Sequence, residues 1–191
     1  VLRRHGDEER KVWLADAWSG RFPPSPDSEE DTSVEELMNR LFNESPDAEQ
    51  VAENFRACGL YDERVRLVQG YFCDTLPKLE IPPLALLRLD ADLYSSTMDA
   101  LTHLYPKLSP GGIAIIDDYG IRFCDCQKAV DEYRAKHGIT DPIHWVERQC
   151  VYWRKSGFRA RSSSPSQARI PSPAPRAGTP APPSYRIVSA R

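Results

Sequence analysis

The stretch Leu84–Gly120, which reads LALLRLDADLYSSTMDALTHLYPKLSPGGIAIIDDYG, decides the fold of this chain. Two short apolar runs, 84–89 and 113–116, have the length and composition of buried strands. A helix-length segment and the turn sequence Ser109–Gly112 separate them. Strand, helix, turn and strand in this order predict a right-handed βαβ unit whose two strands are parallel.

Each of the two predicted strands runs directly into a pair of acids. The first is followed by Asp90 and Asp92, and the second by Asp117 and Asp118. Because the carboxyl ends of parallel strands meet at one edge of a sheet, both pairs should face the crevice where open α/β sheets bind ligands. Carboxylates this close repel one another unless a cation joins them, and oxygen ligands without His or Cys suit Mg²⁺ or Ca²⁺.

A carboxylate outside the metal shell could act as a general base towards a substrate hydroxyl whose pKa the ion lowers. The alternative for Asp92 and for Asp118 is a structural one, in which each caps the following helix or closes a turn. The residues alone leave both interpretations open.

The rest of the chain alternates strands and helices in the same way. Further helices are predicted at 34–43, 48–58 and 126–137, and further strands at 11–15, 65–69, 143–146 and 150–154. Ser33, Asp47 and either Ser95 or Ser96 are the expected helix caps. The last two strands should form an antiparallel hairpin. This pattern predicts a doubly wound, mostly parallel α/β sheet.

Composition limits the function. Residues 157–191 hold six arginines and no acid, so the net charge of −3 leaves −9 on the other 156 residues, and an acidic body argues against nucleic acid as a partner. No apolar run is long enough for a membrane span. Five scattered cysteines predict reduced thiols in a cytoplasm. The segment 157–191 is rich in Pro, Ser and Arg and is expected to be a disordered tail beyond a domain of residues 1–156.

The blocks LRLDADLYSSTMDALTHLYPKLSPGGIAIIDDYG, CQKAVDEYRAKHGITDPI and VYWRK resemble the macrocin O-methyltransferase (TylF-type) family, and the resemblance extends over about residues 8 to 155. The DADLY and IIDDYG blocks are specific in combination, with 27 residues from Asp90 to Asp117. The resemblance implies a Rossmann-like class I methyltransferase fold that uses S-adenosylmethionine and Mg²⁺ and methylates a sugar hydroxyl of a glycosylated natural product. It leaves open whether the protein forms a homo-oligomer.

The resemblance also implies roles for individual residues. Asp90, Asp117 and Asp118 match the metal ligands and Asp92 matches the general base. Asp16, at the end of its predicted strand, matches the acid that holds the cofactor ribose. Gly70, Tyr71 and Phe72 lie where the adenine pocket of the family begins, although core packing is an alternative for the aromatic residues.

In one respect the chain departs from the family. The family has a first strand and a glycine-rich turn before the strand that ends at Asp16, whereas only ten residues precede Lys11 here and Gly6 is their single glycine. We therefore expect an N-terminally truncated sequence with Val1 at its start. The strands ending at Asp16 and Asp90 should then have unpaired edges in the middle of the sheet.

Three other functions remain open at this point. A catechol-type acceptor would also offer a vicinal diol to a metal ion. Asp90-Ala91-Asp92 is a DxD sequence, which in some glycosyltransferases holds Mn²⁺ and a nucleotide sugar. An inactive remnant, with its metal site intact and its cofactor site lost, would explain the missing glycine-rich turn.

Overall fold

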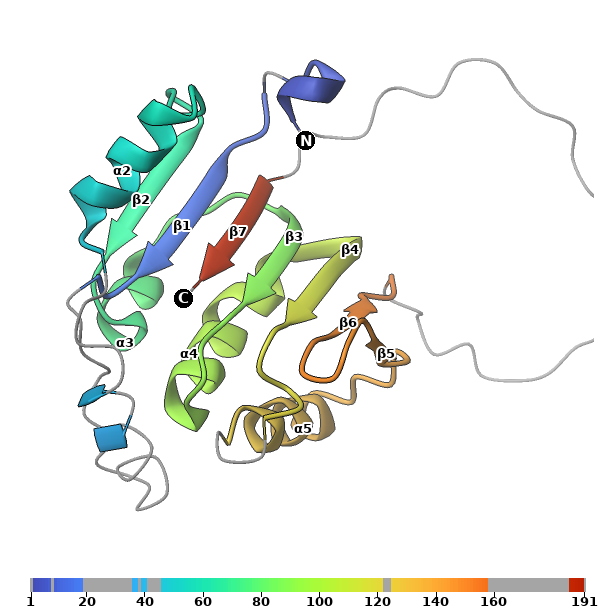
Figure 1. Cartoon of the computed structure of the whole chain (residues 1–191). Coiled ribbons are helices and arrows are strands. Elements are labelled where there is room, and N and C mark those ends of the chain that lie inside the picture. Colours follow the sequence, from blue (N-terminus) through green and yellow to red (C-terminus); the bar gives the residue numbers. More distant parts are fainter. Residues whose placement is uncertain are drawn as a thin grey trace, which may run out of the picture.

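The structure is a computed structural model that describes residues 2–7, 9–18, 36–37, 39–40, 46–121 and 125–157, together with the backbone of 186–190. Its centre is a seven-stranded sheet in the order β2-β1-β7-β3-β4-β6-β5 (Figure 1). The strands are β1 (Val12–Asp16), β2 (Val65–Gln69), β3 (Leu84–Leu89), β4 (Leu108–Ile116), β5 (His144–Trp145), β6 (Val151–Arg154) and β7 (Arg186–Ala190).

Five strands, from β2 to β4 in the sheet order, are parallel, and β6 and β5 are antiparallel. This confirms the predicted α/β fold with a mostly parallel sheet and a closing hairpin. The helices are α2 (Ala48–Ala57), α3 (Phe72–Thr75), α4 (Tyr94–Leu104) and α5 (Cys126–Lys136), with 3₁₀ turns η1 (Arg3–His5), η2 (Leu76–Lys78) and η3 (Tyr105–Lys107).

The core lies between the sheet and α4. Side chains alternate along each strand, so Leu87 and Leu89 of β3 share the buried face with Ala114 and Ile116 of β4. Helix α4 lies behind β3 and packs against α5, and α3 lies in the same layer (Figure 1). The doubly wound arrangement, with helices on both faces, stays a prediction.

The centre of the sheet differs from the expectation. Figure 1 shows β7 between β1 and β3, and it pairs in parallel with both. The two strand edges that should have been unpaired are therefore paired, and the expected disorder of the tail is wrong for residues 186–190. Prolines and serines dominate the composition of the tail, so its average composition does not reveal the short β-branched sequence Ile187-Val188. In addition, an open strand edge can pair with any extended segment.

Several local expectations are refined. Asp47 caps α2 in a capping box with Gln50, as its position predicted. Ser95 and Ser96 do not cap α4, because the helix already begins at Tyr94 after Leu93. The sequence Ser109–Gly112 is the irregular first part of β4 rather than a turn before it.

Some expectations fall on residues that the structure does not describe. Residues 36–37 and 39–40 are helical, within the helix predicted at 34–43, whereas Ser33 and most of the tail lie outside the described residues. In the described part of the chain, no helix has both the length and the apolar character needed to cross a membrane. Cys58, Cys73, Cys126 and Cys150 are free thiols.

Candidate active site

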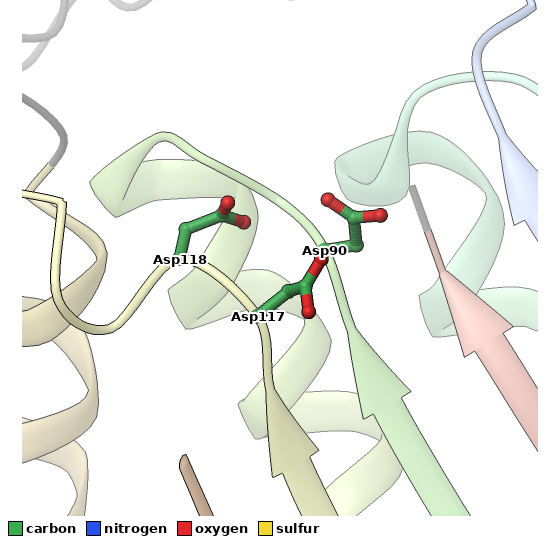
Figure 2. Close-up of side chains that lie close together, drawn as sticks. All are labelled: Asp90, Asp117 and Asp118. Atoms are coloured by element: carbon green, nitrogen blue, oxygen red, sulfur yellow. The ribbon is translucent and has the colours of Figure 1, made fainter. Parts of the chain in front are cut away.

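The predicted acids lie together at the carboxyl ends of β3 and β4. Leu89 pairs with Ile116 in the last register position of the two strands, and the N–H of Asp117 donates to the carbonyl of Leu89 at 2.8 Å. Asp90 and Asp117 therefore leave their strands at the same level. Figure 2 shows Asp90, Asp117 and Asp118 around a common space at this edge.

The three carboxylates fit a divalent cation. Each offers one oxygen, and these oxygens all lie within 4.8 Å of one another. Opposite ligands of Mg²⁺ are about 4.2 Å apart and those of Ca²⁺ about 5 Å, so the oxygens need little movement to share one ion. The donor set holds oxygen only, which is the set that hard cations prefer.

Burial disfavours the anionic form of Asp118. Its residue is 7% exposed, and burial raises its pKa to about 6, with further increases from the charges of Asp90 and Asp117. The backbone N–H groups of Asp92, at 3.3 Å, and of Ala91 lower the pKa in part. A cation at this position would oppose the increase, since it favours the charged carboxylate.

The loop after β4 holds Asp118 in place against the hairpin. The N–H of Gly120 donates to the carbonyl of Gln149 at 3.0 Å. A Cβ atom on Gly120 would lie 2.2 Å from the carbonyl oxygen of Arg148, so only glycine allows this approach. On the same side, burial and then the charge of Asp117 raise the pKa of the buried Cys150 thiol.

Asp92 lies beside the three-carboxylate cluster in a strained turn. Its φ is +53°, a left-handed value that is uncommon outside glycine, and the N–H of Leu93 donates to the carbonyl of Ala91 at 2.6 Å across it. This tight turn ends β3 and begins α4. A strained residue next to a ligand cluster favours the functional interpretation of Asp92 over that of a helix cap.

Sequence reasoning missed Arg88 at this site. Its guanidinium donates to Asp90 Oδ2 at 2.9 Å and to Asp117 Oδ2 at 2.6 Å. The signal was present, because residues two apart on a strand point to the same face, so Arg88 had to lie beneath Asp90. The register also places Arg88 opposite Ile115, two residues before Asp117.

The predicted cofactor residues gather at the same edge, on β1 and β2. Asp16 Oδ1 accepts the N–H of Trp18 at 2.9 Å, and the carbonyl of Asp16 accepts the N–H of Gly70 at 3.0 Å. Trp18, which sequence reasoning also missed, is buried with a φ of +44°. Gly70 has a φ of +132°, and a Cβ there would lie 2.8 Å from the Thr75 methyl group.

The two aromatic candidates have different environments. Tyr71 is half-buried and precedes α3, where its carbonyl accepts the hydroxyl of Thr75 at 2.9 Å. Phe72 is 6% exposed and belongs to the hydrophobic core. The structure therefore brings Asp16, Gly70 and Tyr71 together at the edge and places the Phe72 side chain in the core.

One strand separates the Asp16 group from the acid cluster. Ala15 pairs with Ala190 of β7, which pairs with Leu89 on its other side. Asp16 and Asp90 thus leave the sheet at the same level, two strand spacings or about 10 Å apart. Both groups therefore lie at the carboxyl edge of the parallel sheet, the edge where such sheets bind ligands.

Comparison with known proteins gives a consistent result. Over residues 1–155 the chain matches the family described as macrocin-O-methyltransferase (TylF). It is 45% identical over 87% of its length to the 8-demethyl-8-(2,3-dimethoxy-alpha-L-rhamnosyl)-tetracenomycin-C 4'-O-methyltransferase of Streptomyces olivaceus. It is also 45% identical over 82% of its length to the mycinamicin III 3''-O-methyltransferase of Micromonospora griseorubida.

A solved structure agrees with these relatives. The O-methyltransferase NovP is 44% identical, with a TM-score of 0.76 over 82% of this chain and 64% of NovP. The chain spans about three fifths of the two curated relatives, at 63% and 61% of their lengths. On the match over residues 1–155 and on these identities, the chain belongs to the macrocin-O-methyltransferase (TylF) family.

Proposed function

We propose that this chain functions as an O-methyltransferase that uses S-adenosylmethionine and Mg²⁺ and methylates a sugar hydroxyl of a glycosylated natural product. The observation that carries the proposal is the cluster of Asp90, Asp117 and Asp118 at the carboxyl edge of the sheet, in a chain of the TylF family. Both relatives are named as O-methyltransferases, and one of them is named for a rhamnosyl-bearing compound, which supports a glycoside as the acceptor. The same names disfavour the glycosyltransferase interpretation of the DxD sequence.

Asp90, Asp117 and Asp118 are the residues that would hold Mg²⁺. When bound, the ion would lower the pKa of a hydroxyl that coordinates it, and the cofactor would supply the methyl group. Asp92 follows Asp90 by two residues and lies outside the three-carboxylate cluster. Its carboxylate is the proposed general base, which would accept the proton of the sugar hydroxyl.

The cofactor would lie across the crevice from β1 towards β3. Asp16 is suited to accept both ribose hydroxyl protons, since a carboxylate accepts and does not donate hydrogen bonds. Gly70, Tyr71 and Phe72 are the proposed adenine neighbours, with Phe72 acting from the core. The separation of about 10 Å between Asp16 and Asp90 leaves room for a nucleoside and its reactive group between ribose site and metal site.

We assign this activity to a domain of residues 1–156, whose sheet is completed by β7 from the tail. The partner of the domain is a small glycoside, and no role is proposed for nucleic acid or for a membrane surface. A cytoplasmic location, with the cofactor and reduced thiols available, is part of the proposal.

The test is methyl transfer by the full chain. The purified chain is incubated with S-adenosylmethionine labelled in its methyl group and with an aryl rhamnoside that carries a free vicinal diol, with Mg²⁺ or with EDTA. We expect labelled glycoside with Mg²⁺ only. Asp92→Asn should lower the rate by about 10² to 10⁴ while S-adenosylhomocysteine binding, measured by calorimetry, stays unchanged.

Glu63→Gln is the matched control, because it also removes one carboxylate. Glu63 is exposed and precedes β2 at the opposite edge of the sheet, so this variant should keep the full rate. Transfer to a catechol but not to any glycoside would contradict the proposed acceptor. Absence of both cofactor binding and methyl transfer would favour an inactive remnant.

A further inference from the structure

The positively charged side chain of Arg88 contacts the acid cluster directly. Its two guanidinium nitrogens reach Asp90 and Asp117 at 2.9 and 2.6 Å, so one side chain bridges two of the three carboxylates proposed as metal ligands. The Asp90 side chain is 7% exposed, and those of Arg88 and Asp117 are 34% and 32% exposed. These ion pairs are therefore partly shielded from water. Charges in such a position interact more strongly than charges at the surface.

The fold gives Arg88 little alternative to this position. It lies on β3 two residues before Asp90 and therefore on the same face of the sheet. The neighbouring strand β4 places Asp117 at the same level as Asp90. The guanidinium also keeps its charge at every working pH, because arginine is not deprotonated in proteins.

The positive charge has opposite effects on two states of the site. Without a divalent ion, three carboxylates within 4.8 Å repel one another, and Arg88 offsets part of that repulsion. With a divalent ion in the cluster, the same guanidinium repels the ion and competes for Asp90 and Asp117. A side chain that acts only as a packing or hydrogen-bonding support would instead favour both states.

We propose that Arg88 is a built-in counter-cation of the acid cluster: it stabilises the chain while no divalent ion is bound, and it weakens the binding of that ion. The inference rests on the metal dependence proposed above. It gives Arg88 a defined role in setting how readily the ion exchanges, without contact with the reacting atoms.

The test uses the full chain and Mg²⁺ alone, with neither cofactor nor acceptor. Arg88→Met keeps most of the side-chain volume and removes the charge, and Arg88→Lys keeps the charge and loses the two-pronged geometry. Arg66→Met is the matched control, because Arg66 is also half-buried on a parallel strand and donates to the carbonyl of Val65 rather than to an acid of the cluster. Thermal midpoints in EDTA and calorimetric Mg²⁺ affinities are measured for all four chains.

For Arg88→Met we expect a midpoint in EDTA lower by about 3 °C or more and a Mg²⁺ affinity higher by about tenfold. Arg88→Lys should lower the midpoint and keep an affinity close to that of the original chain. A fall of both quantities in Arg88→Met would overturn the proposal and make Arg88 a structural support of the ligands.

A second outcome separates this inference from the proposed function. If neither the original chain nor Arg88→Met binds Mg²⁺, the metal-dependent function fails and the effect of Arg88 on ion binding fails with it. The midpoint in EDTA still tests the first half of the inference in that case, because the repulsion among the acids does not depend on any ion. An unchanged midpoint in Arg88→Met would overturn that half as well.

Discussion

The two ends of the carboxyl edge of the sheet are built in different ways. At the β3–β4 end, the acids come from one continuous βαβ unit, and α4 lies between the two strands in the sequence. At the β1–β3 end, the strand between them is β7, which comes from the far end of the chain. The first region is assembled by contacts that are local in the sequence. The second pairs β1 with β7, the two paired strands that lie farthest apart in the sequence.

This difference has an energetic consequence. A loop of more residues costs more entropy to close, although the cost grows only slowly with length. Contacts between distant segments also form late and slowly in folding. The β3–β4 end with its acid cluster should therefore form without the rest of the sheet, whereas the pairing at the centre of the sheet depends on one short strand with two parallel neighbours.

The largest expected effect comes from breaking β7. Val188 pairs with Trp13 of β1 and with Leu87 of β3, so Val188→Pro removes a backbone donor in a central strand. We expect a loss of about 3 kcal/mol or more in the free energy of unfolding, measured by urea denaturation. Hydrogen exchange should rise in β1 and β3 and change less at the β3–β4 pairing.

Ala177→Pro is the control for this variant, because it adds a proline in a segment that already contains many and that the structure does not describe. It should leave the unfolding free energy within about 0.5 kcal/mol of the original value. Equal exchange rates in β1 and β3 for the original chain and for Val188→Pro would mean that β7 does not hold the two strands together in solution.

A smaller effect is expected at the β3–β4 end of this edge, from the ion. Mg²⁺ at 100 times its dissociation constant should stabilise the chain by about 2.7 kcal/mol, provided that the unfolded chain does not bind it. The protection from hydrogen exchange should concentrate at Ala91–Leu93 and at Asp117–Tyr119. Asp117→Asn should abolish most of this increase, and an increase of equal size in that variant would exclude the carboxylate cluster as the binding site.

The same contrast explains which features could be predicted from the sequence. The meeting of Asp90 with Asp117 follows from two strand rules, the parallel direction in a βαβ unit and the alternation of side chains, and it is confirmed. Arg88 follows from the same alternation, but its neighbours were treated only as a hydrophobic run. The capping of α2 by Asp47 was predictable because a capping box is a local pattern.

The rest depended on contacts that local patterns do not contain. The pairing of β7 depends on an open position far away in the sequence, and the average composition of residues 157–191 pointed instead to disorder. Ser95 and Ser96 fail as caps because the tight turn at Asp92 already starts α4 at Tyr94, after Leu93. The role of Gly120 depends on the nearby carbonyl of Arg148, which no local pattern contains.

The smallest expected effect comes from removing the buried charge of Asp118, at the β3–β4 end of the sheet edge. The pKa of Asp118 is raised to about 6 from its usual 3.8, so the folded chain binds this proton more tightly than the unfolded chain does. The metal-free chain should therefore lose stability as the pH rises from about 4 to 6, because the buried carboxylate then becomes charged. Asp118→Asn stays neutral throughout and should be more stable than the original chain at pH 7 by about 1 kcal/mol or more, since a pKa unit corresponds to about 1.4 kcal/mol.

The difference between the two chains should vanish towards pH 4, where both side chains are neutral, and thermal unfolding in EDTA across this range measures it. With Mg²⁺ the order should reverse, because Asp118→Asn has lost one of the three carboxylates of the cluster. Glu63→Gln serves again as control, and its difference from the original chain should not follow the same pH window. A variant that is less stable than the original chain at pH 7 in EDTA would mean that Asp118 is stabilising as an anion without any metal, through the N–H groups of Ala91 and Asp92.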